Sequence, residues 1–244
     1  MSDEAASLIP ATFLPSLENL DVELDARDLP MLGQYLDRLL ETNRSFNLTA
    51  IRNATEAWTS HILDSLSLLP ILAREGVGHV IDVGSGGGLP GIPLAITMPD
   101  VTFALVEATG KKAAFLADVV EELALDNVTI IAERAETVGQ PDGGFRNAAD
   151  AVIARAVGPL CVLLELTLPL ARVDGLVLAI KGRRAAEELT EAEAAMRVLK
   201  GERISCERSE TGTVVAIRKI GETPRRFPRR PGEPKRNPIG GTSS

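Results

Sequence analysis

A glycine-rich stretch with an acid at its start is where residue types and spacing point most clearly to chemistry. It reads Asp82-Val-Gly-Ser-Gly-Gly-Gly-Leu-Pro-Gly91. Its first two residues are the last two of a short apolar run, residues 79–83. Glycines after a buried strand let the backbone turn tightly and approach a ligand, and the next helix offers its N-terminus to that ligand. The stretch therefore predicts a cofactor site, and a tight turn without a ligand is the plainer alternative.

Two carboxylates near these glycines narrow the choice of cofactor. Asp82 completes the pattern Asp-x-Gly-x-Gly-x-Gly of S-adenosylmethionine (SAM) methyltransferases, in which the acid faces the amino group of the cofactor. Glu107 ends the next apolar run, where a carboxylate can accept hydrogen bonds from both ribose hydroxyls. A solvated loop acid is the alternative for Glu107. The cofactor-binding residues predicted from this pattern are Asp82, Gly84, Gly86, Gly88 and Glu107.

A dinucleotide would suit the same loop, since Gly86–Gly91 also matches the fingerprint Gly-x-Gly-x-x-Gly. A dehydrogenase additionally needs an acid–base group for hydride transfer, commonly His or Tyr. Tyr35, His61 and His79 all precede the loop, and none is expected at the carboxyl end of a strand. A methyltransferase has only to align a nucleophile with a methyl group that is already activated. SAM is therefore the predicted cofactor, and a NAD-dependent oxidoreductase is the alternative.

Arg155 ends a further apolar run, at the edge where open α/β sheets bind their ligands. The Asp/Asn-Pro-Pro-aromatic box of enzymes that methylate exocyclic amines is missing there. Enzymes that methylate C5 of cytosine need a nucleophilic cysteine, but Cys161 is interpreted as a buried core thiol. Guanine N7 is already nucleophilic and needs no general base. An arginine can hold a guanine edge, a phosphate or the carboxylate of the cofactor. Arg155 is therefore predicted to be catalytic and to contact the cofactor, with a structural salt bridge as the alternative.

Apolar runs that alternate with helical segments predict the elements that position these residues. Such alternation indicates βαβ units and a parallel sheet, and the short turn before the last run indicates an antiparallel hairpin. The predicted fold is α/β: a doubly wound, mostly parallel seven-stranded sheet of the class I SAM-dependent methyltransferase type, with an N-terminal helical cap. The predicted strands are residues 79–83, 101–106, 128–131, 151–154, 176–180, 203–207 and 214–218, and the helices between them 92–97, 111–125, 160–171 and 185–199.

Charge is spread unevenly along the chain, and the predicted parts follow it. The whole chain has a net charge of −8, but residues 223–238 hold six bases and one acid, which leaves −13 for the remainder. Five prolines in that stretch argue against a helix or a central strand, so an extended, mobile arm is expected. The predicted parts are an acidic N-terminal segment (1–30), a helical cap (31–76), a SAM-binding domain (77–220) and a basic, proline-rich tail (221–244).

Composition excludes several classes of protein. With 244 residues, 45% of them apolar and 25% charged, the chain suits a folded protein with a sizeable core. Two cysteines build neither a disulfide scaffold nor a zinc knuckle, so no metal is expected. The acidic start and the lack of a long apolar run predict a cytoplasmic protein without a membrane span. The acidic total and the 3% aromatic content argue against nucleic-acid binding, until the basic tail is considered separately.

Seven motifs and the basic tail occur in a recognisable order. They are Asn47-Leu48-Thr49-Ala50, His61-Ile62-Leu63-Asp64-Ser65-Leu66, Asp82 to Pro93, Lys111-Lys112-x-x-Phe115-Leu116, Arg134-Ala135-Glu136, Arg155-Ala156, Lys181-Gly182 and Pro224 to Pro238. This set resembles the bacterial 16S ribosomal RNA guanine-N7 methyltransferases, also called the glucose-inhibited division protein B family, over roughly residues 40–239. The resemblance implies methylation of a guanine in the 530 loop of 16S RNA, at position 527 in the usual ribosomal numbering.

The resemblance also implies roles that spacing alone does not identify. Leu89 would line the SAM site beside Gly84, Ala135 and Glu136 would border the adenine, and Arg155 would face cofactor and substrate. The expected partner is 16S ribosomal RNA or the small ribosomal subunit, and nothing in the sequence requires more than a monomer. A non-catalytic regulator that binds SAM or RNA remains as a second alternative.

Several polar residues keep two interpretations each. His61 and Asp64 share one helix face, either near the cofactor and RNA or in a polar contact between parts of the fold. Lys111 and Lys112 either bind phosphate or are solvated. Lys181, at the end of the fifth predicted strand, is expected to contact phosphate. The predicted RNA-binding residues are Lys181, Arg225, Arg226, Arg229, Arg230, Lys235 and Arg236.

Overall fold

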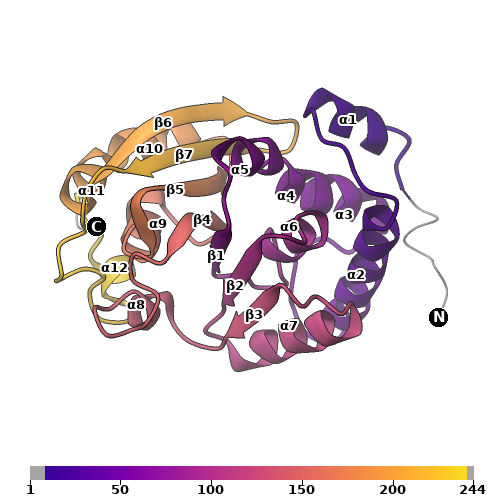
Figure 1. Cartoon of the computed structure of the whole chain (residues 1–244), viewed down its shortest axis with the longest axis horizontal. Coiled ribbons are helices and arrows are strands. Elements are labelled where there is room, and N and C mark those ends of the chain that lie inside the picture. Colours follow the sequence, from indigo (N-terminus) through magenta and orange to yellow (C-terminus); the bar gives the residue numbers. More distant parts are fainter. Residues whose placement is uncertain (1–8, 241–244) are drawn as a thin grey trace.

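Seven strands form one sheet in the order β3-β2-β1-β4-β5-β7-β6 (Figure 1). The computed structural model describes residues 9–240. The five strands β1 to β5 are parallel, and β7 runs antiparallel to both β5 and β6. This confirms the predicted mostly parallel sheet with its terminal hairpin. The strands are β1 (His79–Val83), β2 (Thr102–Val106), β3 (Val128–Ile131), β4 (Ala149–Arg155), β5 (Ala171–Lys181), β6 (Gly201–Arg208) and β7 (Thr213–Lys219).

The central strands are apolar on both faces because helices cover both. Alternate residues of a strand point to opposite faces, so each strand contributes to two cores. In β4, Ala151 and Ile153 lie in one core, while Val152 and Ala154 lie in the other. We call the first face the cap face and the second the tail face. Continuous apolar runs such as residues 151–154 are the expected signature of this arrangement.

The helices that precede β1 cover the cap face together with α6 and α7. Phe13 and Trp58 belong to the same core as Val80 and Phe103, so the predicted cap packs directly on the sheet. The Phe13 and Trp58 rings meet edge to face, with centroids 4.9 Å apart. Residues 1–8 of the acidic segment lie outside the described range. These helices are α1 (Phe13–Asn19), α2 (Asp28–Asn43), α3 (Ala54–Ala57), the π-helix η2 (Trp58–Leu63), α4 (Asp64–Leu66), α5 (Leu69–Glu75), α6 (Gly91–Thr97) and α7 (Gly110–Glu122).

Shorter helices cover the tail face, at the left of Figure 1. The predicted helix 160–171 ends at Thr167, because Pro169 has no N–H group with which to continue it. The predicted helix 185–199 is divided at Ala192 into two helices. These helices are α8 (Ala135–Val138), α9 (Leu160–Thr167), α10 (Ala185–Glu191), α11 (Glu193–Leu199) and α12 (Glu233–Arg236).

The basic tail corrects the expectation of an extended, mobile arm. Phe227 and Pro234 are buried, and residues 233–236 form the short helix α12 despite the prolines around them. The prediction was wrong for two physical reasons. Proline is tolerated in the first turn of a helix, and one aromatic side chain is enough to anchor the segment in a core.

Within residues 9–240, no helix is long and apolar enough to cross a membrane. The same residues contain no group of three or more His, Cys, Asp or Glu side chains that could hold a metal ion. Cys161 is a free, buried thiol of α9, as the sequence predicted.

Candidate active site

The glycine loop, residues 84–91, connects the end of β1 to α6. Gly84, Gly86 and Gly88 have positive φ angles of 73°, 58° and 97°, which other residues rarely adopt. A Cβ on Gly88 would lie 2.6 Å from the Ile92 side chain, whereas a Cβ on Gly86 would meet nothing closer than 3.8 Å. Gly88 thus lets the loop pack on α6, and Gly86 leaves backbone that a ligand can approach.

Tyr35, from α2, holds the middle of this loop. Its hydroxyl donates a hydrogen bond of 2.7 Å to the carbonyl oxygen of Gly87. Complete burial raises the pKa of Tyr35 well above its usual range, so the hydroxyl remains a donor. From the sequence, Tyr35 was expected only to precede the loop. In the structure it forms part of the wall of the site. Its only signal in the sequence was one polar group on the apolar face of α2.

Asp82 lies at the end of β1 and is fully buried. Its Oδ2 accepts a hydrogen bond from the backbone N–H of Gly91, and its Oδ1 has no partner among residues 9–240. Burial raises the pKa of Asp82 to about 7, against the lowering effects of the nearby Ser85 hydroxyl and of the hydrogen bond from Gly91. An unpartnered buried carboxylate oxygen is costly unless a ligand donates to it. Asp82 therefore suits a cationic amino group.

Glu107 follows β2 and ties this strand end to the glycine loop. Its carboxylate accepts hydrogen bonds from the N–H groups of Gly86 (2.9 Å) and Thr109 (2.7 Å). Since β1 and β2 pair with Val83 opposite Val106, the acid lies directly beside the loop. Each carboxylate oxygen retains a further lone pair, so ribose hydroxyls can still donate to it.

Glu136, the first acid of α8, links the neighbouring part of the site to the tail. Its carboxylate accepts a hydrogen bond from the N–H of Gly232 (2.8 Å) and forms an ion pair with Arg134 (3.3 Å). Burial raises the pKa of Glu136, but these donors outweigh it and hold the pKa below its usual value. Ala135 and Leu89, the other residues expected at the cofactor, are buried. The contact between Glu136 and the tail had no signal in the sequence.

Arg155 reaches from the end of β4 to the π-helix η2 on the cap face. Its Nη1 donates to the carbonyl oxygen of Ser60 (2.9 Å) and to Oδ2 of Asp64 (3.0 Å), and its Nη2 lies 3.2 Å from Nδ1 of His61. Among the described residues its Nε–H makes no hydrogen bond. The arginine is therefore held along one side of the guanidinium and keeps donors for a ligand. The structure shows the salt bridge of the second interpretation, and the catalytic role of Arg155 stays a prediction.

His61 is a neutral positioning residue at this point. Its Nε2 lies 2.7 Å from the hydroxyl of Thr49, and its Nδ1 lies 3.0 Å from the carbonyl oxygen of Ser60. Burial lowers the pKa of His61 to about 4, and the charge of Arg155 acts in the same direction. His61 and Asp64 thus connect the cap to the end of β4 through Arg155, which is the polar contact that the sequence offered as one of its two interpretations.

The segment after Arg155 is held in an unusual conformation. Ala156 has a φ of +56°, which a residue with a Cβ rarely adopts, and Gly158 has a φ of +123°.

Asp64 has a second partner besides Arg155. The hydroxyl of Thr211 in the β6–β7 turn donates to Oδ1 of Asp64 (2.6 Å). The Thr211 contact had no signal in the sequence, because it depends on how the hairpin folds over α4.

Lys181 is placed differently from the expectation. It is buried, and its Nζ donates to the carbonyl oxygen of Gly158 (2.6 Å) and pairs with Glu188 (2.7 Å). Glu188 also accepts from the N–H of Leu160 (2.8 Å). Lys181 therefore braces the segment after Arg155 from the tail face and does not present a free cation for phosphate.

Comparison with known proteins identifies the relatives of this chain. The family model described as rRNA small subunit methyltransferase G matches residues 28–216. The chain belongs to this family. The "Ribosomal RNA small subunit methyltransferase G" of Sorangium cellulosum (strain So ce56) is 48% identical over 222 residues, which cover 91% of this chain and 92% of that one. The family membership makes the chain a SAM-dependent methyltransferase, as the sequence predicted.

Solved structures agree on the fold. A putative O-methyltransferase from Klebsiella pneumoniae is 16% identical and covers 89% of this chain and all of its own, with a TM-score of 0.59. The O-methyltransferase from Bacillus cereus in complex with SAH is also 16% identical, covers 88% of this chain and all of its own, and has a TM-score of 0.58. These similarities confirm the class I SAM methyltransferase fold.

The tail cations differ in their exposure to solvent. Arg229 is half-buried, and its guanidinium is bound to the fully buried Glu165 of α9. The sequence expectation that Arg229 binds RNA therefore meets an arginine that is already paired. The other predicted RNA-binding cations of the tail are exposed: Arg225, Arg226, Arg230, Lys235 and Arg236.

The residues around the glycine loop fit SAM. The unpartnered Oδ1 of Asp82 can accept from a cationic amino group, and the open backbone of Gly86 allows close approach. Glu107 offers acceptors to ribose hydroxyls beside the same loop. Arg155 adds unused donors at the adjoining strand end. Asp82 and Glu107 thus offer acceptors that would suit the amino group and the ribose of SAM, and Arg155 offers donors at the same edge of the sheet.

Proposed function

We propose that this methyltransferase acts on N7 of one guanine in the 530 loop of 16S ribosomal RNA, at position 527 in the usual numbering. The supporting observation is a cofactor loop beside Arg155, an arginine that is held on one side and keeps donors on the other. Transfer to N7 requires no proton removal, since N7 carries a free lone pair. The only histidine at the site, His61, is neutral and already paired, which suits chemistry without a general base.

In this proposal the chain holds two reactants in line. SAM supplies a methyl group that its sulfonium has already activated. Gly84, Gly86, Gly88 and Leu89 shape its site, Asp82 accepts from its amino group, Glu107 binds the ribose, and Ala135 and Glu136 border the adenine. Arg155 donates to O6 of the guanine and leaves the lone pair of N7 free for direct displacement.

The decisive experiment maps 7-methylguanosine in ribosomal RNA from cells with and without this protein. We expect loss of one modification, in the 530 loop, that the wild-type protein restores and Arg155→Ala does not. Unchanged methylation at that guanine in cells lacking the protein would contradict the assignment. Incubating RNA and small subunits with labelled SAM separates catalysis from the alternative of a non-catalytic regulator, which would incorporate no label.

The geometry of the same site does not favour an oxidoreductase, in agreement with the family membership. Its acid–base group would have to be Tyr35 or His61, and both are engaged: Tyr35 with Gly87, and His61 with Thr49 and Ser60. Thermal unfolding with each cofactor tests this point. We expect S-adenosylhomocysteine to raise the melting temperature and NAD to leave it unchanged.

A further inference from the structure

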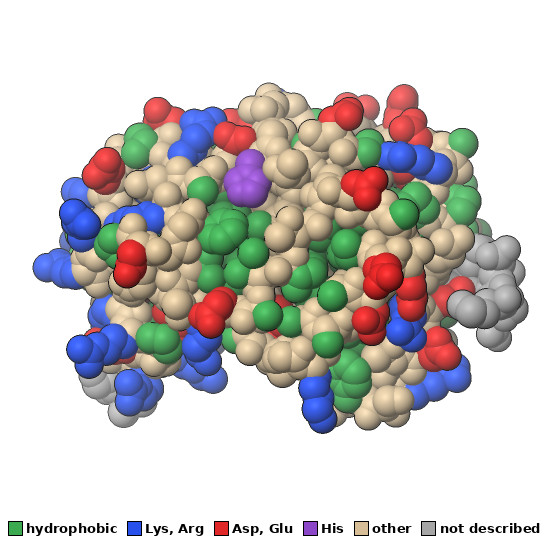
Figure 2. Space-filling model, turned by 60° about the horizontal axis from the view of Figure 1, so that its bottom comes forward, with side chains coloured by type: hydrophobic (Ala, Val, Ile, Leu, Met, Phe, Trp, Pro, Cys, Tyr) green, Lys and Arg blue, Asp and Glu red, His purple; other side chains and the backbone are tan. Residues whose placement is uncertain are grey.

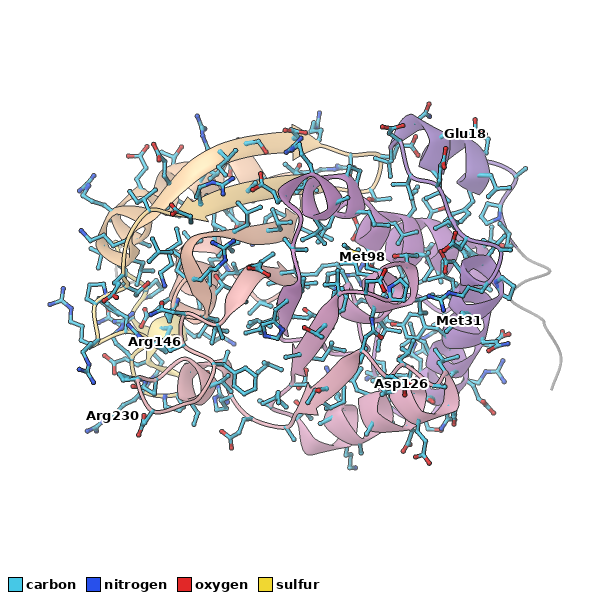
Figure 3. The ribbon with its side chains drawn as sticks, viewed as in Figure 1. Glu18, Met31, Met98, Asp126, Arg146 and Arg230 are labelled. Atoms are coloured by element: carbon cyan, nitrogen blue, oxygen red, sulfur yellow. The ribbon has the colours of Figure 1, made fainter. Side chains whose placement is uncertain are left out.

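The tail is fixed to the body by contacts to its backbone. The Arg146 guanidinium donates to the carbonyl oxygens of Thr223 (2.5 Å) and Phe227 (2.7 Å), and Gln140 donates to that of Pro228 (2.8 Å). The N–H of Gly232 donates to Glu136. Arg146 lies among these segments in Figure 3. Such contacts set the path of the segment without using its exposed cations.

Two side chains anchor this path in the protein interior. Phe227 is 6% exposed and belongs to the tail-face core with Val138 and Leu163. Glu165 is 0% exposed, and Arg229 binds it through Nη2 (2.6 Å), Nε (2.9 Å) and the backbone N–H (2.8 Å). A buried carboxylate that loses its partner destabilises strongly, so undocking the tail would be costly.

The docked tail holds its remaining cations outward in fixed positions. Lysine and arginine side chains gather at the left end of Figure 2, the end at which α8, α12 and the tail lie in Figure 1. Arg230 projects from the outer edge of this end in Figure 3. We call the exposed set the basic plate: Arg225, Arg226, Arg230, Lys235 and Arg236.

We propose that the basic plate is a preformed binding surface for RNA phosphates, and that its affinity depends on the docking of the tail. This inference rests on the proposed function and deepens it. Ordering a free segment costs conformational entropy, and a docked segment has already lost that entropy on folding. Because the rest of the chain has a net charge of −13, its field repels RNA phosphates, and cations released by undocking would be drawn toward the acidic body instead of being held outward.

The basic plate also lies close to the predicted adenine site. Glu136, which the proposal puts at the adenine of SAM, accepts the hydrogen bond from Gly232 in the loop that leads into α12. An RNA backbone held on the plate would therefore lie beside the predicted cofactor site. The pair of Glu165 and Arg229 thereby becomes a positioning element for RNA, although Glu165 itself is buried.

Two variants that keep every plate cation test the inference. Phe227→Ala changes no charge, and Glu165→Gln removes a negative charge. A mobile polycationic arm would bind RNA equally well or better after either change. The docked plate predicts at least about fivefold weaker binding near 0.15 M salt and a shallower salt dependence, as for the loss of one or two phosphate contacts. The measurement is fluorescence anisotropy with a labelled transcript of the 530-loop region, over a salt series.

Three controls keep the outcome interpretable. Trypsin cleavage within residues 225–230 reports undocking, and the double variant Glu165→Gln/Phe227→Ala is used if either single variant stays protected. Retained thermal stabilisation by S-adenosylhomocysteine shows that the body is folded. Arg225→Ala/Arg226→Ala should weaken binding as well, whereas Arg74→Ala, an exposed arginine of α5, should not.

The results separate the inference from the proposed function. A cleavable tail with unchanged RNA affinity overturns the plate while methylation stands. Unchanged affinity in Arg225→Ala/Arg226→Ala would also overturn it and would assign these cations to another polyanion, such as an acidic protein. If the wild-type protein neither binds nor methylates the RNA, the proposed function itself fails.

Discussion

Arg155 and Lys181 end two neighbouring parallel strands, but they serve opposite faces of the sheet. Arg155 continues the cap-face side of β4, and Lys181 continues the tail-face side of β5. Each cation meets a carboxylate from a helix on its own face, Asp64 for Arg155 and Glu188 for Lys181. The strand ends bring both cations to one edge, and the alternation of side chains places Arg155 on the cap face and Lys181 on the tail face.

The two ion pairs also differ in the hydrogen-bond donors that they leave available to a ligand. The Lys181 side chain is 7% exposed, and its ammonium group contacts Glu188 and the carbonyl oxygen of Gly158. The Arg155 side chain is 17% exposed and uses one side of its guanidinium on Asp64 and Ser60. A planar fork with five donors can be anchored and still bind a ligand, whereas an ammonium group has three donors. We therefore propose ligand contact for Arg155, whereas Lys181 supports the segment 156–160.

Replacing Arg155 should give the largest loss of activity. Arg155→Ala removes the donors next to the cofactor loop, and we expect kcat to fall roughly 100-fold or more, as for other donors at a reacting group. Arg155→Lys should recover little, because a lysine cannot bind Asp64 and a ligand through one planar fork. Single-turnover methylation measures both variants, and SAM affinity reports the cofactor contact separately. Activity within threefold of wild type in Arg155→Ala would refute the assignment.

Removing the partner of Arg155 should have the next largest effect. Asp64→Asn keeps the shape of the side chain but loses the ion pair, and a misplaced guanidinium should lower kcat roughly tenfold to thirtyfold. Thr211→Val removes the hydroxyl that donates to Asp64 and should act in the same direction, more weakly. A merely structural role predicts a lower melting temperature with unchanged kcat. That outcome would remove Asp64 from the positioning network.

The strands around the cofactor could be predicted from sequence because each signal was local. Glycines at 84, 86 and 88 follow a buried strand, and these positions adopt the positive φ angles that favour glycine. Glu107 could be placed for the same reason, since its distance from the loop is set by one βαβ unit. The hairpin was equally local, with its short turn at residues 209–212.

The contacts that were missed join distant segments. Tyr35 lies 52 residues from Gly87, Thr211 lies 147 residues from Asp64, and Arg229 lies 64 residues from Glu165. Periodicity does not report which helix a strand end will meet. The tail was misjudged because its composition is that of a disordered segment, although Phe227 supplies an anchor and Glu165 supplies a buried partner.

The pH dependence of SAM binding sharpens the role of Asp82 at the same edge. Burial raises its pKa to about 7, and a cationic amino group favours the ionised form. SAM affinity should therefore increase as the pH rises from 6 to 8, by up to roughly tenfold. The linkage has the opposite sign for the ligand-free protein, whose stability contribution from Asp82 declines between the unfolded pKa of 3.8 and about 7.

Isothermal titration calorimetry with wild type and Asp82→Asn measures the SAM affinity, and denaturant unfolding of the two proteins measures the stability of the ligand-free state. His61, with a pKa of about 4, does not titrate in this range. A pH dependence that persists in Asp82→Asn would locate the titrating group elsewhere.

The smallest effect on activity is expected for the pair on the tail face, and it tests the comparison directly. Lys181→Met and Glu188→Gln each break the brace on Gly158 and Leu160. Both should destabilise the protein by about 2 kcal/mol, less than a fully buried pair because Glu188 is partly exposed. Both should lower kcat only a few-fold, because residues 156–160 become less rigid while Arg155 stays in place.

If Lys181 and Glu188 act as one brace, the two variants should change the free energy of unfolding, measured with denaturant, and the methylation rate by equal amounts. If Lys181→Met instead abolishes activity while Glu188→Gln is mild, Lys181 contacts RNA or cofactor during the reaction, and the division of labour between the two strand ends is wrong.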